Sequence, residues 1–190
     1  MKKPTFTNRP NKPHKTDDGT IWHSRSAAVV CSVVLSVQQQ LSRKESRYIL
    51  LGKRGDAADY KGKWNIPCGY FDWQENLRHA FRREVWEETG INIDELAEEN
   101  QMLIDSTDQP WSVNTEPDEN LQNITLHGFI MIRTSSLPET SLDNMEKNES
   151  VEARWFKLED ALEIKKEDWA FNHYDRLRIL IKHFDLRPQI

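Results

Sequence analysis

The stretch GYFDWQENLRHAFRREVWEETGI, from Gly69 to Ile91, is the most informative part of this chain. Between Glu75 and Thr89 it contains no glycine or proline and many residues that favour helices. Gly90 follows directly, at the position where helices commonly end in the left-handed conformation. The pattern therefore predicts a helix over 75–89, preceded by a loop that begins at Gly69.

Three glutamates form an acidic patch on this predicted helix. Glu84, Glu87 and Glu88 fall within an arc of about 100° and continue the apolar stripe of residues 77–81, so they face the same side as the core. Partly buried carboxylates without partners are costly, whereas Mg²⁺ or Mn²⁺, which prefer oxygen ligands, would remove that cost. The patch thus indicates a divalent-cation site, with a solvated acidic helix end as the alternative.

Neighbouring residues fit the interpretation as a cation site. Arg83 lies one turn before Glu87 and can hold a carboxylate by a charge-assisted hydrogen bond. Glu75, at the predicted helix start, is favoured by the helix dipole. Gly69 can take backbone angles that are closed to other residues. We therefore expect the loop and the helix to build one site together.

Composition excludes several classes of protein. The chain has 190 residues and a formal net charge of −5, which argues against a surface that grips a nucleic-acid backbone. No apolar run approaches the ~20 residues of a membrane-spanning helix, and the polar residues 1–20 contain no hydrophobic signal segment. The two cysteines, Cys31 and Cys68, are neither a disulfide framework nor a zinc ribbon. We therefore expect a soluble, cytoplasmic protein with reduced thiols.

The rest of the chain reads as one mixed domain. Residues 1–20 are predicted to be a mobile leader and residues 21–190 a single α+β domain, with helices set against a largely β core. Residues 108–123 are predicted to form a polar loop. Strands are predicted over 27–37, 47–53, 102–105, 124–132 and 153–156, and further helices over 158–164 and 169–184.

The spacing of the glycine, glutamate, arginine and aliphatic residues in the stretch 69–91 resembles the signature box of the Nudix hydrolases. The box is a glycine, five residues, a glutamate, seven residues, an Arg-Glu pair with an aliphatic residue after it, one residue, a Glu-Glu pair, one residue, and a closing glycine with an aliphatic residue after it. The matching residues are Gly69, Glu75, Arg83, Glu84, Val85, Glu87, Glu88, Gly90 and Ile91. The likeness extends over residues 22 to 184, since segments 54–69, 153–162 and 169–180 also resemble parts of that family.

The resemblance implies a fold and a reaction. Nudix proteins have an α/β/α sandwich with a mixed sheet and cleave a nucleoside diphosphate linked to another moiety, by attack of water on phosphorus with the help of divalent ions. Carried over by position, the metal ligands would be Glu84, Glu87, Glu88 and the carbonyl of Gly69. Arg83 would orient a glutamate of the box, and Glu75 and Gly90 would support the site. The expected cofactor is Mg²⁺, with Mn²⁺ as an option.

The general base and the substrate contacts are less defined. The base is expected to be a glutamate of the box, such as Glu87, or a later one, for which Glu149 is the main candidate and Glu116 and Glu119 are weaker ones. Arg54 near a strand end and Trp111 in the long loop are candidate substrate contacts. Arg25, also near a strand end, could meet phosphate in the same way. For both arginines the alternative is a plain surface position, and for Trp111 it is core packing.

Three other functions remain open at this point. The segment Gln109-Pro110-Trp111 matches part of an element of the NADH-cleaving branch of the family. A non-catalytic nucleotide sensor would keep the fold without turnover. An isoprenoid diphosphate isomerase would need a catalytic cysteine and a changed box, which Cys68 alone does not supply. In each case a small molecule is the expected partner, and a homodimer is one option for assembly.

Overall fold

The structure is a computed structural model that describes residues 1–2, 4, 13–19, 21–23, 27–38, 45–56, 59–116, 124–143 and 149–186. The predictions for Arg25 and Glu119 lie outside these residues. Among the described residues, eight strands form one mixed sheet, whose central order is β10-β4-β3-β9-β7. The strands of this path are β3 (Ala27–Gln38), β4 (Glu45–Arg54), β7 (Gln101–Asp105), β9 (Ile124–Thr134) and β10 (Ser150–Lys157).

Strand directions explain the mixed character of the sheet. β3 and β9 run parallel, and β4 pairs antiparallel with both β3 and β10. Three short strands attach to this frame: β5 (Trp64–Asn65) pairs with β4, β6 (Cys68–Tyr70) with β3, and β8 (Ser112–Asn114) with β9. The strands predicted over 27–37 and 47–53 correspond to β3 and β4, which pair antiparallel.

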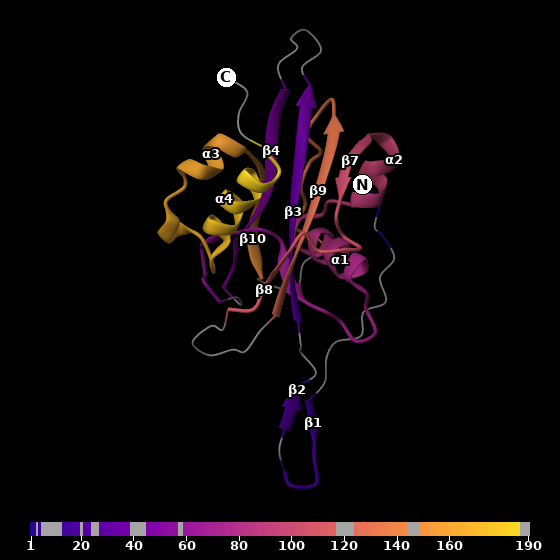
Figure 1. Cartoon of the computed structure of the whole chain (residues 1–190), viewed down its shortest axis with the longest axis vertical. Coiled ribbons are helices and arrows are strands. Elements are labelled where there is room, and N and C mark those ends of the chain that lie inside the picture. Colours follow the sequence, from indigo (N-terminus) through magenta and orange to yellow (C-terminus); the bar gives the residue numbers. More distant parts are fainter. Residues whose placement is uncertain are drawn as a thin grey trace.

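Helices cover both faces of the sheet (Figure 1). One face carries α1 (Leu77–Thr89) and α2 (Ile93–Glu99), and the other carries α3 (Leu158–Glu163) and α4 (His173–His183). Because β3 is covered on both faces, its side chains are buried on both, which is why its sequence is a continuous apolar run rather than an alternating one. The predicted α+β fold, an α/β/α sandwich with a mixed sheet, is confirmed.

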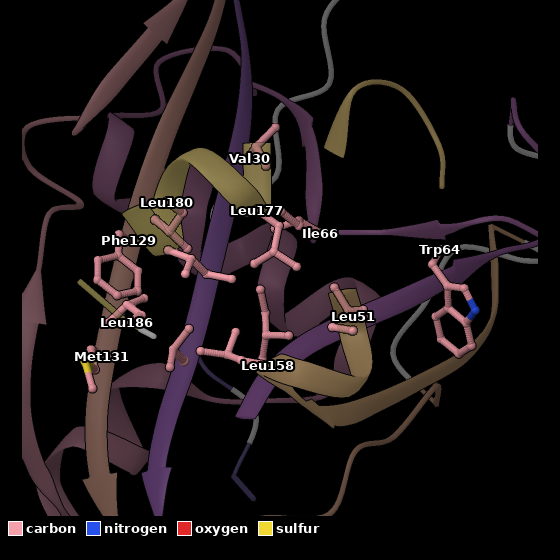
Figure 2. Close-up of a cluster of buried hydrophobic side chains, with 14 of the residues drawn as sticks. Val30, Leu51, Trp64, Ile66, Phe129, Met131, Leu158, Leu177, Leu180 and Leu186 are labelled. Carbon is pink, nitrogen blue, oxygen red and sulfur yellow. The ribbon is translucent and has the colours of Figure 1, made fainter. Parts of the chain in front are cut away.

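Figure 2 shows the core layer on the α4 face of the sheet. Leu177 and Leu180 of α4 pack with Phe129 and Met131 of β9, and Leu158 of α3 joins them. The layer on the α1 face is a separate cluster, in which Phe81 and Val85 of α1 pack against the opposite sides of the same strands. The sheet therefore separates two cores, and each helix layer is fixed to it independently.

Helix α1 begins two residues later than predicted. The side chain of Asn76 accepts a hydrogen bond from the backbone N–H of His79 at 2.9 Å and so caps the helix, which leaves Glu75 in the preceding loop. The end of α1 agrees with the prediction, since Gly90 has a φ of 71° and its N–H donates to Trp86. A side chain at Gly90 would also meet the backbone of Ser141 at 2.8 Å, so glycine is required there.

Three other segments differ from the prediction. Within the polar loop predicted over 108–123, residues 112–114 form strand β8, which pairs with β9, and residues 117–123 lie outside the described residues. Helix α2 was not predicted, because it is short and is capped by the side chain of Asn92 rather than marked by a long apolar period. The last helix begins at His173, because residues 166–168 form a 3₁₀ turn and Trp169 bridges to Trp64.

The first residues of the chain are partly placed. β1 (Pro13–Lys15) pairs antiparallel with β2 (Ile21–His23), so the domain boundary predicted at residue 20 falls inside a two-stranded ladder. The backbone of Lys2 bonds with Glu95 and Asn92 at the start of α2. The division into leader and domain stays a prediction. Within the part of the chain that the structure describes, no helix is long and apolar enough to cross a membrane.

Candidate active site

Arg83 of α1 is the centre of an acidic cluster, which we define as Glu75, Glu84, Glu87 and Glu88. Its guanidinium donates to both carboxylate oxygens of Glu75 at 2.9 and 2.8 Å. It also donates to Glu84 at 2.7 Å and to Glu87 at 2.9 Å. A further bond to the carbonyl of Tyr70 ties α1 to the loop before it. One cation thus holds three carboxylates, as the sequence predicted for at least one of them.

Burial decides the charge state of this acidic cluster. Glu84 and Glu88 are each only 8% exposed. Burial raises the pKa of Glu84 to about 7; Arg83 opposes the rise, and the neighbouring carboxylates of Glu87 and Glu75 add to it. Burial and the nearby Glu84 also raise the pKa of Glu88 well above its usual range, against the pull of Arg54 and Asn65. Burial therefore favours the protonated form of both carboxyl groups, and a bound cation would favour the ionised form.

Asn65 of β5 is a member of the site that sequence reasoning missed. It is fully buried, and its Nδ2 donates to Glu88 at 3.1 Å. Its Oδ1 is buried without a hydrogen-bond partner. An added Cβ on Gly52 would lie 3.2 Å from this oxygen and 3.7 Å from Glu88, so the backbone of β4 closes the other side. The only sequence signal was a polar residue between the apolar anchors Trp64 and Ile66.

Gly69 packs directly against the acidic cluster. It lies in β6 opposite Val29 of β3, and an added methyl group there would overlap the carboxylate of Glu84. The close approach explains the requirement for glycine at this point by steric contact, because its φ is not positive. The backbone of Gly69 therefore lies in the same small volume as the Glu84 carboxylate.

The donor set of this volume fits a hard divalent cation. It combines buried carboxylates of raised pKa with an unpartnered amide oxygen, and Mg²⁺ and Mn²⁺ prefer such oxygen ligands. Among the residues that the structure describes, no three His, Cys, Asp or Glu side chains converge closely enough to enclose an ion. Arg83 already engages oxygens of Glu84 and Glu87, so an ion would compete with its guanidinium for them.

Two predicted residues lie together at the sheet edge beside the acidic cluster. Arg54, at the end of β4, donates from Nε to the carbonyl of Asp59 at 2.5 Å, and its charge lowers the pKa of Glu88. Glu149 is exposed, and its carbonyl accepts a hydrogen bond from the N–H of Gly55 at 2.6 Å. Arg54 and Glu149 are thus neighbours through the backbone, where the end of β4 pairs with the start of β10.

Other residues singled out in the sequence lie elsewhere. Trp111 packs against His127, His183 and Phe184, in contact with the core of the α4 face. Glu116 is exposed beyond β8. The thiol of Cys68 lies beside Glu88, and burial followed by that carboxylate raises its pKa, so it stays protonated rather than reactive. Packing is therefore the observed environment of Trp111, and Cys68 lies in strand β6 beside Glu88.

Comparison with known proteins gives the family. The profile of the NUDIX domain matches residues 26–177. The chain belongs to the Nudix family. The Nudix hydrolase 19, chloroplastic, of Arabidopsis thaliana is 30% identical over 103 residues, which are 54% of this chain and 19% of that protein. The chain thus spans about a fifth of the length of this curated relative.

Solved structures confirm the Nudix fold. The NUDIX domain of Shewanella oneidensis NrtR with ADP ribose has a TM-score of 0.58 at 16% identity, with 86% of this chain and 90% of that one covered. RenU, a Nudix hydrolase from M. smegmatis, has a TM-score of 0.60 at 15% identity, with 94% and 98% covered. A bifunctional NMN adenylyltransferase/ADP ribose pyrophosphatase from Francisella tularensis, complexed with AMP and a Mn ion, has a TM-score of 0.60 at 22% identity, with 84% and 42% covered. The chain therefore has the Nudix fold that its box predicted.

Proposed function

We propose that this Nudix domain hydrolyses the pyrophosphate bond of a nucleoside diphosphate linked to another moiety, with Mg²⁺ or Mn²⁺ as cofactor. The observation that carries the proposal is the pair of buried carboxylates, Glu84 and Glu88, beside the unpartnered oxygen of Asn65. Such a pair is costly in a merely structural role, and a divalent cation removes the cost. Relatives that bind ADP ribose, or AMP with a Mn ion, support this class of substrate.

The metal would be held by Glu84, Glu87 and Glu88, together with the carbonyl of Gly69. When bound, a divalent ion neutralises phosphoryl oxygens and lowers the pKa of a coordinated water. Metal binding requires ionised carboxylates, so the raised pKa of Glu84 makes binding weaker as the pH falls. Within the chain, α1 carries the three glutamates on about one turn, and β6 carries Gly69.

Arg83 and Glu75 act by positioning. Arg83 links the loop carboxylate of Glu75 to Glu84 and Glu87 on the helix, and Glu75 also accepts a hydrogen bond from the backbone of Asp72 at 2.9 Å. Loop and helix are thus fixed to each other by charge-assisted hydrogen bonds. We expect this arrangement to orient the carboxylates toward the substrate side.

The proton acceptor for the attacking water is proposed to be Glu87 or Glu149. The side chain of Glu87 is 27% exposed and is held by Arg83, so it meets solvent in a fixed orientation. Glu149 is exposed, and its carbonyl accepts a hydrogen bond from the N–H of Gly55, the residue after Arg54. A carboxylate can act as the base only when it lies within hydrogen-bond distance of the attacking water. Replacing Glu87 and Glu149 separately therefore distinguishes the two candidates.

A direct assay tests the proposal. Purified protein is incubated with Mg²⁺ and a panel that contains ADP ribose, NADH and a dinucleoside tetraphosphate, and products are resolved by ³¹P NMR in H₂¹⁸O. We expect one member to be cleaved, with ¹⁸O in a phosphoryl product, and turnover to stop on chelation. Glu87→Gln should lose turnover by at least about 100-fold, whereas Glu99→Gln, on the exposed end of α2, should not. Folded protein that cleaves no member contradicts the proposal.

The same panel separates the alternatives that the sequence leaves open. A nucleotide sensor would bind a member of the panel with wild-type residues and never turn it over. Preferential cleavage of NADH would assign the finer activity suggested by Gln109-Pro110-Trp111. Cytoplasmic location and homodimer formation are further predictions, to be checked by fractionation and by light scattering.

A further inference from the structure

Two aromatic residues far apart in the sequence adopt a backbone conformation that side chains rarely take. Among the described residues, the non-glycine residues with positive φ are Tyr60 (59°), Gln74, Phe171 (54°) and Asp185. The left-handed region favours glycine or asparagine, and bulky side chains there are uncommon. Strain of this kind persists where the surrounding structure imposes it, often at ligand sites.

The rings of Tyr60 and Phe171 meet at the surface. Their centroids are 4.6 Å apart with an interplanar angle of 57°. Tyr60 is 40% exposed and Phe171 is 43% exposed, so burial in a core does not account for the contact. We call this pair the aromatic platform.

Both turns of the aromatic platform are anchored to the sheet. In the first turn, the N–H of Gly62 donates to the carbonyl of Arg54 at 2.8 Å, and that of Lys63 to Tyr60 at 3.1 Å. In the second, the N–H of Ala170 donates to the carbonyl of Trp64 at 2.8 Å. β4 and β5, which supply these carbonyls, also carry Arg54 and Asn65 of the site. The platform is therefore held at a fixed place relative to the acidic cluster.

Two cations accompany the rings. The guanidinium of Arg54 lies 5.0 Å from the centroid of Phe171, and the ammonium of Lys63 lies 5.6 Å from that of Tyr60. Arg54 also interacts electrostatically with Glu88, so one cation acts on both the ring of Phe171 and a carboxylate of the cluster. Exposed aromatic faces next to two cations and a phosphoryl-transfer site match the parts of a nucleotide: a flat base and an anionic phosphate.

We propose that the aromatic platform of Tyr60 and Phe171 binds the base of the nucleotide substrate, while Arg54 and Lys63 contact its phosphates. The inference rests on the proposed function for the class of substrate and adds where the base binds. Strained but anchored turns present the rings in a fixed arrangement, which lowers the entropic cost of stacking. The cations attract the phosphate toward the end of the site that borders the acidic cluster.

Binding of nucleoside monophosphates, compared with ribose 5-phosphate, isolates the contribution of the base. AMP, GMP, CMP and UMP are titrated by calorimetry in the presence of Mg²⁺, each against ribose 5-phosphate. At least one nucleotide should bind about tenfold more tightly than the sugar phosphate, as expected for stacking on aromatic side chains. In the double variant Tyr60→Asn/Phe171→Asn this preference should disappear.

The choice of asparagine keeps the test independent of folding. Asparagine tolerates the left-handed conformation, so the double variant should unfold at the same temperature as the wild type or higher. Asp185→Asn places asparagine at another exposed position with positive φ, but it removes no aromatic ring, so this variant should keep the preference. Tyr60→Phe retains the ring and should keep it too. Lys63→Gln should weaken binding of AMP and ribose 5-phosphate by the same factor.

Two outcomes of the binding titrations overturn the inference. One is a wild type that shows no preference for any of the four nucleotides; the other is a folded double variant that keeps the preference. Neither requires turnover, so a failure here is distinct from a failure of the proposed hydrolysis. Conversely, a double variant that hydrolyses its substrate with an unchanged KM would reject the platform and leave the hydrolase proposal intact.

Discussion

Arg82 and Arg83 are consecutive residues of α1, and each is 5% exposed, yet they belong to different regions of the molecule. Arg82 points to the side of α2 and β7, where it bonds with Asp94 at 2.8 Å, Asp105 at 3.0 Å and Thr107 at 2.7 Å. Arg83 points to the acidic cluster. The pair shows how one helix joins a structural ion network to a candidate active site.

The balance of charge distinguishes the two networks. Burial lowers the pKa of Arg82, but Asp94 and Asp105 more than compensate, and Arg78 supplies a second cation to Asp105. Asp94 is mostly exposed, so water stabilises it as well. Arg83 instead faces Glu75, Glu84 and Glu87, with Glu88 close by, and no second arginine joins it in the ion pairs of the described residues. A buried network with too few cations indicates a site for a metal ion, whereas a network with balanced charges indicates a structural role.

The largest expected effect is on turnover, from replacing Arg83. Arg83→Gln releases Glu75, Glu84 and Glu87 from their common donor, so their orientation is lost together with their main positive charge. We expect kcat to fall by at least about 100-fold, as for loss of a group that fixes an electrostatic site. Steady-state kinetics at saturating Mg²⁺ measures it. A variant with near wild-type kcat would show that the carboxylates are positioned without Arg83.

The next effect is on stability, from replacing Arg82. Arg82→Ala leaves Asp105 without its main partner and should lower the free energy of unfolding by about 3–5 kcal/mol, the usual cost of breaking a buried ion pair. Chemical denaturation measures the loss. The kcat of the folded fraction, assayed well below the midpoint, should stay within a few-fold of wild type. If Arg82→Ala lowers kcat as much as Arg83→Gln, the two networks are not separate.

The acidic cluster should also impose a pH dependence on the metal-free protein. Burial raises the pKa of Glu84 from its ordinary 4.5 to about 7, so the folded state holds a proton that the unfolded state has released. This contribution to stability is complete below pH 4.5 and is lost as the pH rises to about 7. At about 1.4 kcal/mol for each pH unit between 4.5 and 7, its size is about 3 kcal/mol.

The comparison that isolates Glu84 is wild type against Glu84→Gln in chelator, by thermal unfolding from pH 4.5 to 7.5. As the pH rises, the wild type should lose its advantage in stability over Glu84→Gln and then become the less stable of the two. His127 and His173, whose pKa values burial lowers to about 4 and about 3, change stability in the opposite direction but equally in both proteins. Added Mg²⁺ at about 100 times its Kd should restore about 2.7 kcal/mol to the wild type. Parallel curves would contradict a proton held by Glu84.

Local signals in the sequence were sufficient to predict the helix that carries the glutamates of the site. The helix that carries Glu84, Glu87 and Glu88, and its end at Gly90, follow from residue types within one segment. The start of α1 was misplaced because Asn76 and Glu75 are both favourable near a helix start, and only the bond from His79 to Asn76 selects between them.

Residues that act through the pairing of distant strands were not predictable in this way. Asn65 reaches Glu88 because β5 pairs with β4 opposite Gly52, a contact that no local pattern encodes. Tyr60 and Phe171 meet because both of their turns are attached to the β4–β5 region. Trp111 was open between substrate contact and packing, and its neighbours on the α4 face come from β9 and the end of α4.

The smallest expected effect comes from Arg78, which tests whether burial rather than the number of ion pairs sets the strength of the structural network. Arg78 bonds with Asp105 at 3.1 Å and with Asp108 at 3.3 Å, but its side chain is 39% exposed and that of Asp108 is 74% exposed. Exposed pairs are screened by water and salt, so Arg78→Ala should cost no more than about 1 kcal/mol. Denaturation at low and high salt measures the cost, and the difference from wild type should narrow at high salt. A loss of stability as large as that of Arg82→Ala, and unchanged by salt, would mean that Asp105 depends on both arginines equally. Burial would then not set the strength of these ion pairs.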